Sequence, residues 1–134
     1  MNRFVTTMGR VILITMACVA MLTVAGCGKP SATQLAEGMV DSMAKGDFAS
    51  ATRDFDATMA AAMSSEKLGQ TWAQLTAQAG AFKSRTGSRE AQEASFQMVY
   101  VTCQFEKTSL DIRVVIGASG QVSGLWFVPT QPAK

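Results

Sequence analysis

The sequence predicts an α+β fold in which N-terminal helices pack on a curved antiparallel sheet of about four strands. In the front half of the chain, apolar residues recur at the helical period. From Phe96 onward they alternate with polar residues, as in strands that bury one face. Turn-forming residues separate the alternating runs. Because the helices precede the strands, the pattern favours α+β over α/β.

The helical half contains recognisable start and stop signals. Ser31 and Gln34 have the spacing of a capping box, and Gly46 supplies a left-handed stop. Asp47 is the next expected N-cap, and Gly80 ends the last helix. The expected helices cover residues 32–45, 48–55, 58–63 and 65–79.

The second half predicts strands joined by hairpins. Residues 81–94 are polar and contain Thr86-Gly87-Ser88, which indicates a first strand with a turn or bulge. Lys83, Arg85 and Arg89 are interpreted as charges that protect an edge strand from unwanted pairing. The three remaining strands are expected over residues 96–105, 110–116 and 122–128.

The N-terminus has the features of an export signal. Met1 to Arg10 is basic, and Val11 to Val24 is uncharged but spans only about 21 Å as a helix, which is short for a bilayer. Val24-Ala25-Gly26-Cys27 resembles the bacterial lipobox. That resemblance implies diacylglyceryl transfer to the Cys27 sulfur and signal cleavage between Gly26 and Cys27.

These features divide the chain into four parts and predict its location. They are a lipoprotein signal peptide (1–26), a lipidated cysteine with a short tether (27–31), the α+β domain (32–130) and a tail (131–134). Two acyl chains give stable membrane anchoring. We therefore expect the protein in the bacterial cell envelope, anchored by lipid to the outer face of the cytoplasmic membrane or to the outer membrane.

Composition excludes several classes of function. Two of the twelve basic residues, Arg3 and Arg10, lie in the signal segment, which leaves ten basic against ten acidic residues and no basic footprint for nucleic acid. The chain has no histidine, which excludes serine-histidine triads and histidine metal sites. Cys103 is the only cysteine after Cys27, so no disulfide forms within the domain. We expect no metal and no cofactor.

Several residues together resemble a known family. They are Lys45-Gly46-Asp47-Phe48, Phe55-Asp56, Met59, Leu68, Trp72, Gly80-Ala81-Phe82, Val99-x-Val101-x-Cys103-x-Phe105, Leu110-x-Ile112-x-Val114 and Gly124-Leu125-x-Phe127-x-Pro129. Over roughly residues 32–130 this pattern is similar to the secreted bacterial domain of unknown function 3887. The resemblance implies a cystatin-like, nuclear-transport-factor-two-like fold. In some members such a domain precedes an α/β-hydrolase or peptidase, and we expect no such catalytic domain here.

The cone between the sheet and the helices is a candidate pocket or a filled core. The residues expected to line a pocket are Trp72, Phe96, Tyr100 and Trp126. Relatives of the implied fold include isomerases and dehydratases with an aspartate base and a tyrosine oxyanion donor. Asp54, Asp56 and Tyr100 are the only residues here that could take those roles. Cys103 alternates with Val101 and Phe105 and is expected to be a buried, unreactive thiol.

The leading hypothesis is a non-enzymatic lipoprotein whose domain binds an envelope protein, a cell-wall polymer or a small hydrophobic ligand. A histidine-free acid/base enzyme is the first alternative. A structural module that forms a homodimer through an exposed sheet face is the second, with Val115, Leu125 and Phe127 as its patch.

Overall fold

The computed structural model describes residues 28–131 of the 134-residue chain. The expected signal peptide, with its cleavage site at Gly26 and Cys27, lies outside the described residues, as do residues 132–134. Within residues 28–131, four helices precede four strands, which confirms the predicted α+β class.

The helices begin where the sequence supplies an N-cap. They are α1 (Ala32–Ala44), α2 (Phe48–Thr52), α3 (Ala57–Ala62) and α4 (Ser65–Ala79). Each is preceded by a serine or aspartate whose side chain accepts a hydrogen bond from the backbone N–H three residues later. Ser31 and Gln34 form the predicted capping box. The second helix is shorter than predicted because Phe55 leaves it to form a parallel bridge with Val122.

The strands form one antiparallel meander in the order β1-β2-β3-β4. Their bounds are β1 (Phe82–Glu93), β2 (Phe96–Phe105), β3 (Ser109–Ile116) and β4 (Val122–Pro129). The predicted irregularity in the first strand is confirmed, because the register of β1 against β2 shifts between Phe82 and Ser84 and again between Arg85 and Gly87. β1 and β4 are the edge strands.

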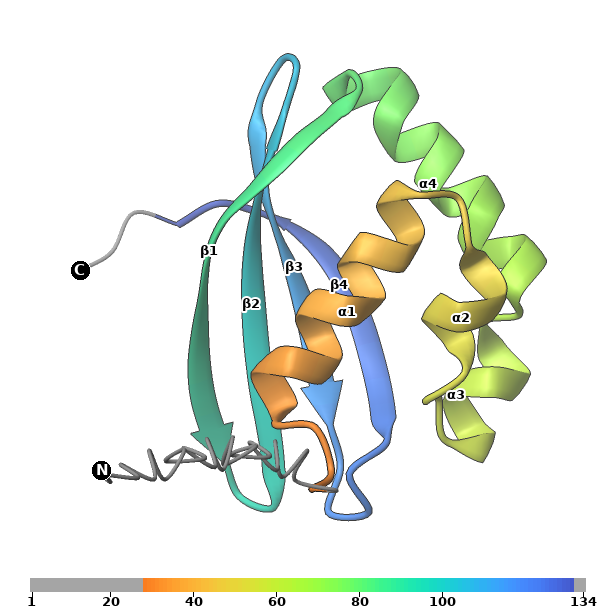
Figure 1. Cartoon of the computed structure of the whole chain (residues 1–134), viewed down its shortest axis with the longest axis vertical. Helices are drawn as coiled ribbons and strands as arrows, with labels where there is room; N and C mark the ends of the chain where they lie inside the picture. Colours follow the sequence, from red (N-terminus) through yellow and green to blue (C-terminus); the bar gives the residue numbers. More distant parts are fainter. Residues whose placement is uncertain (1–27, 132–134) are drawn as a thin grey trace, which may run out of the picture.

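All four helices lie on one side of the sheet (Figure 1). We call the sheet face beneath them the inner face and the opposite one the outer face. Val99, Val101 and Cys103 of β2 point inward and are fully buried, whereas the intervening Tyr100 and Thr102 point outward. The core lies between the inner face and the apolar sides of the helices, where Val40, Met43 and Leu68 are fully buried and Phe105 and Ile112 fill the sheet side.

The start of α1 and two hairpin turns lie at the same end of the sheet (Figure 1). These are the β1–β2 turn and the β3–β4 turn. A hydrogen bond from Thr33 of α1 to Glu90 of β1 joins the helix start to this end. No helix among residues 28–131 is both long and apolar enough to cross a bilayer.

Candidate functional site

The inner face is filled with side chains. The ring of Trp72 on α4 lies 5.8 Å from that of Phe105, 6.0 Å from that of Phe82 and 6.4 Å from that of Phe127, measured between centroids. Trp72 is only 8% exposed. The cone is therefore the hydrophobic core at this position, as the filled-core alternative predicted.

The outer face carries the other three residues predicted to line a pocket. Phe96, Tyr100 and Trp126 share this face because side chains alternate along a strand and the register aligns β2, β3 and β4. Phe96 is 45% exposed and Trp126 is 49% exposed. The prediction of one pocket lined by all four residues is thus wrong, since the sheet separates Trp72 from the rest. Of the other three, Phe96 and Trp126 line a groove on the outer face, whereas Tyr100 does not.

A groove of about 640 Å³ lies on the outer face. This volume is in the range of small-molecule sites. Its floor and walls come from β2, β3 and β4, and its ends come from the β1–β2 turn and the start of α3. It is lined by Asp56, Thr58, Glu93, Ala94, Phe96, Met98, Arg113, Val115, Ser123 and Trp126. Met98 is 8% exposed although it lies outside the main core, and its sulfur lies 3.1 Å from Nη2 of Arg113.

Gly124 makes room for the Trp126 ring. Both residues point to the outer face of β4, two positions apart. A Cβ atom on Gly124 would lie 2.3 Å from both Cη2 and Cζ3 of Trp126, far inside van der Waals contact. The indole therefore lies back along its own strand over the glycine, and this position forms one wall of the groove.

A row of alternating cations and aromatic rings crosses the outer face. Register pairs Arg89 with Tyr100, Tyr100 with Arg113, and Arg113 with Trp126, so the row has one residue on each strand. The guanidinium carbon of Arg89 lies 3.8 Å from the centroid of Tyr100. That of Arg113 lies 5.1 Å from the Trp126 ring and 6.0 Å from the Tyr100 ring. These distances are those of cation–π contacts.

The carboxylate of Asp111 is buried beside this row of cations and rings. It is fully buried, accepts a hydrogen bond from the Thr102 hydroxyl at 2.9 Å and pairs with Arg89 at 3.1 Å. A buried carboxylate needs such partners, because desolvation would otherwise favour its neutral form. Arg89 is therefore held between Asp111 and the Tyr100 ring, and its position is fixed.

The residues considered for acid/base chemistry do not come together. Asp54 lines a separate hollow beside Pro30 and forms only an exposed ion pair with Arg53 at 3.8 Å. Asp56 is the N-cap of α3 and accepts from the Met59 N–H at 2.7 Å. Tyr100 lies beneath Arg89 on the outer face. The geometry gives this alternative no support.

Cys103 is fully buried on the inner face, as predicted. Burial raises the pKa of its thiol to about 12, so it stays protonated at neutral pH.

The patch predicted from Val115, Leu125 and Phe127 is not a single surface. Val115 points outward, whereas Leu125 and Phe127 pack into the core, because the register of β4 against β3 places them inward.

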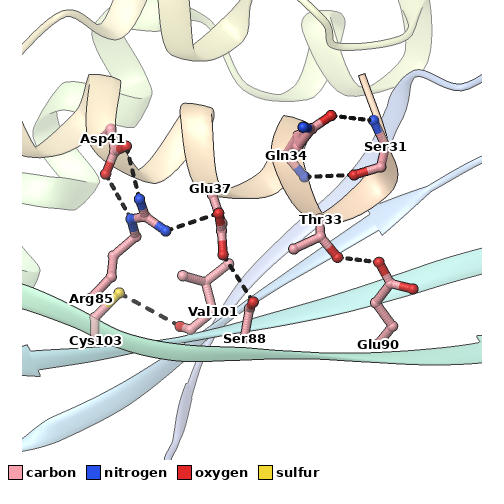
Figure 2. Close-up of polar contacts among 10 residues, drawn as sticks. All are labelled: Ser31, Thr33, Gln34, Glu37, Asp41, Arg85, Ser88, Glu90, Val101 and Cys103. Carbon is pink, nitrogen blue, oxygen red and sulfur yellow. Dashed lines mark hydrogen bonds and ion pairs between the residues drawn. The ribbon is translucent and has the colours of Figure 1, made fainter. Parts of the chain in front are cut away.

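A seam of polar contacts joins α1 to the edge strand β1 (Figure 2). Nε of Arg85 donates to Asp41 at 2.8 Å, and its Nη1 lies 3.1 Å from Glu37. The hydrogen bond to Asp41 raises the pKa of Arg85 further above its already high ordinary value. Because Arg85 faces α1 and Arg89 faces outward, these two arginines do not form the single edge cluster predicted from the sequence. Ser88 with Glu37, and Thr33 with Glu90, complete the seam.

Comparison with known families decides the family of this chain. The model of a family described as "Protein of unknown function (DUF3887)" matches residues 36–125. The chain belongs to this family. No curated protein matches the chain, and no solved structure does. The DUF3887 match confirms the resemblance seen in the sequence, whereas the cystatin-like fold implied by it stays a prediction.

Three residues of the DUF3887 domain site were missed by sequence reasoning: Met98, Asp111 and Arg113. The sequence shows Asp111 and Arg113 as the polar half of an alternating strand, which is also the pattern of an ordinary solvated face. Only the strand register places Arg113 between Tyr100 and Trp126. The sequence signal that could have indicated them is the pair of opposite charges, Asp111 and Arg113, on one face of the otherwise apolar strand over residues 110–116.

Among residues 28–131, no cluster of three or more metal-ligating side chains is present.

Proposed function

We propose that this protein is a lipid-anchored protein of the bacterial envelope whose DUF3887 domain binds a partner or ligand through the outer face of its sheet. In this proposal the domain performs no catalysis. The observation that carries it is the pair of half-exposed aromatic side chains, Phe96 and Trp126, over the groove of about 640 Å³. Large exposed apolar side chains around a concave site are typical of binding surfaces.

The inner face supports the same assignment by elimination. The aromatic cluster around Trp72 occupies the space that a ligand would need between the sheet and the helices. The helices cover the inner face, and only the start of α3 borders the groove on the outer face (Figure 1). The outer face is therefore the better place for a ligand to bind this domain.

The position of the N-terminal segment supports the membrane part of the proposal. Lys29 and Pro30 lie beside the β3–β4 turn, where they line one hollow with Ser119 and Gln121. A lipid on Cys27 would hold this end of the sheet toward the bilayer, because Gly28 follows Cys27 directly. The β1–β2 turn, which bounds the groove, lies at the same end (Figure 1). The outer-face groove would then open close to the membrane surface.

Lipid attachment is tested by metabolic labelling with a radioactive fatty acid. We expect label on the wild-type chain and none on Cys27→Ala, because the thiol is the acceptor. A Cys103→Ala variant is the matched control, and it should keep the label. Label that persists on Cys27→Ala would refute the anchor.

The binding face is tested by photo-crosslinking in intact envelopes. A photoreactive phenylalanine analogue replaces Phe96 on the outer face, and the control places it at Gln74, which is exposed on α4. We expect a discrete crosslinked species from position 96 only. A crosslink to a second copy of the chain would support the dimerisation alternative instead, and crosslinks from position 74 alone would overturn the proposal.

A further inference from the structure

The two arginines of the outer-face row differ in their partners. Arg89 pairs with the buried carboxylate of Asp111 at 3.1 Å. Arg113 forms no ion pair with any carboxylate among residues 28–131. Its Nη2 lies 3.1 Å from the sulfur of Met98, which is a weak acceptor. Its Nε is buried and has no hydrogen-bond partner within the described part of the chain.

This arrangement leaves Arg113 without an ion-pair partner among residues 28–131, at the wall of a largely apolar groove. Buried N–H groups are nearly always paired, and an unpaired one costs about 1–3 kcal/mol. Stacking against Trp126 and Tyr100 holds the guanidinium in place but supplies no hydrogen-bond acceptor. Arginine donors have a fork geometry that matches a carboxylate. Because Arg113 lines the groove and pairs with no carboxylate among residues 28–131, its guanidinium, apart from the buried Nε, is positioned to bind an anionic group from outside the domain.

The surrounding charges favour an anion of low charge. Two acidic residues, Asp56 and Glu93, also line the groove. Asp56 is engaged as the N-cap of α3, and Glu93 is exposed at the end of β1. These two carboxylates repel an anion in the groove, and they repel a doubly charged phosphate more than a singly charged carboxylate. The apolar remainder of such a molecule would lie against Phe96 and Trp126.

We propose that the outer-face groove binds a carboxylate attached to an apolar body, with the guanidinium of Arg113 receiving the carboxylate. This inference rests on the proposed function, because it names the ligand class of the same groove. Arg113 provides the charge-assisted hydrogen bonds, and the aromatic walls provide the contact for the apolar body. Trp126 lies over Arg113 and moves or changes its exposure when the groove fills.

The probe for the test is 4-phenylbutyrate, a water-soluble carboxylate with an apolar body. The full chain in a non-ionic detergent is titrated with it, and binding is followed through tryptophan fluorescence, in which a change that is absent from Trp126→Phe is assigned to Trp126. The alcohol 4-phenylbutanol has the same body without the charge, and 4-phenylbutyl phosphate has a higher charge. We expect the carboxylate to bind about tenfold or more tightly than the alcohol, and more tightly than the phosphate, as a charge-assisted hydrogen bond implies.

Three variants separate the role of Arg113 from a general effect on the fold. Arg113→Met should remove the preference for carboxylate over alcohol, and Arg113→Lys should retain part of it. Arg53→Met, the matched control, removes an equal charge at an exposed site outside the groove and should leave the preference unchanged. Circular dichroism checks that each variant is folded.

The outcomes distinguish this inference from the proposed function. Equal binding of acid and alcohol, or a preference that survives Arg113→Met, overturns the assignment to Arg113. If the phosphate binds most tightly, the carboxylate class is wrong. If no probe binds while position 96 still crosslinks in the envelope, the carboxylate ligand class is wrong, and the assignment of the outer face as the binding face is kept. If position 96 also gives no crosslink, both the ligand class and the binding face are wrong.

Discussion

Substitution of Gly124 by alanine should rearrange the groove without unfolding the domain. The new Cβ would lie 2.3 Å from two atoms at the far edge of the Trp126 indole. Carbon atoms in contact stay about 3.5–4.0 Å apart, so the ring edge must retreat by more than about 1 Å. Because the colliding atoms belong to a half-exposed side chain, the ring can swing outward while the strand stays in place.

The energetic cost of Gly124→Ala should be small. Moving the ring weakens the contact between Trp126 and Arg113, which is worth about 0.5–1 kcal/mol. Alanine is more favourable than glycine within a strand by roughly 0.5–1 kcal/mol, which offsets that loss. We therefore expect the free energy of unfolding to change by less than about 1 kcal/mol. Gly87→Ala is the matched control, because a Cβ there meets no atom within 4 Å.

The assay is denaturant unfolding together with the emission of Trp126. The Trp126 signal is obtained by subtracting the spectrum of Trp126→Phe from that of the parent, and likewise in the Gly124→Ala background. We expect a red shift and stronger acrylamide quenching in Gly124→Ala but not in Gly87→Ala. An unchanged Trp126 signal, or destabilisation by more than about 3 kcal/mol, would refute the reasoning, since the main chain would then have moved in place of the ring.

Two other substitutions test the inner face. Trp72→Ala should lower the free energy of unfolding by about 3–5 kcal/mol, because it removes the ring that contacts Phe82, Phe105 and Phe127; a loss below about 1 kcal/mol in urea unfolding would show that the cluster is not the core. For Cys103, the folded-state pKa is raised from 9.0 to about 12, so its contribution to stability is present below pH 9 and lost as the pH rises toward 12. Between about pH 9 and pH 12, wild type should therefore lose more stability than Cys103→Ala, by up to about 1.4 kcal/mol per pH unit; equal losses would contradict the burial of the thiol.

Local signals were sufficient to predict most of the elements. Ser31 and Asp47 cap helices where the sequence places them, because an N-cap depends on contacts only three residues away. The alternation in 96–105 and 110–116 likewise corresponds to β2 and β3. The early end of α2 was not predictable, since it depends on the bridge from Phe55 to Val122, which is distant in sequence.

The candidate site depends on information that a single sequence does not contain. The alternation of residues along each strand is visible in the sequence. Which sheet face lies against Trp72 depends on how α4 packs on the sheet, and the sequence does not show that. The roles of Arg113 and Asp111 follow from register pairs across three strands, with Arg89 supplied by a fourth. A shift by one residue would send each of these side chains to the other face.

The central claim is that the outer face is the binding surface, and hydroxyl-radical footprinting of the full chain tests it most directly. Side-chain oxidation is compared between intact envelopes and the purified protein in detergent. We expect Phe96 and Trp126 to be oxidised less in the envelope, while Leu75 on α4 is oxidised equally in both. Equal oxidation of Phe96 and Trp126 in the two preparations, with protection on α4, would contradict it.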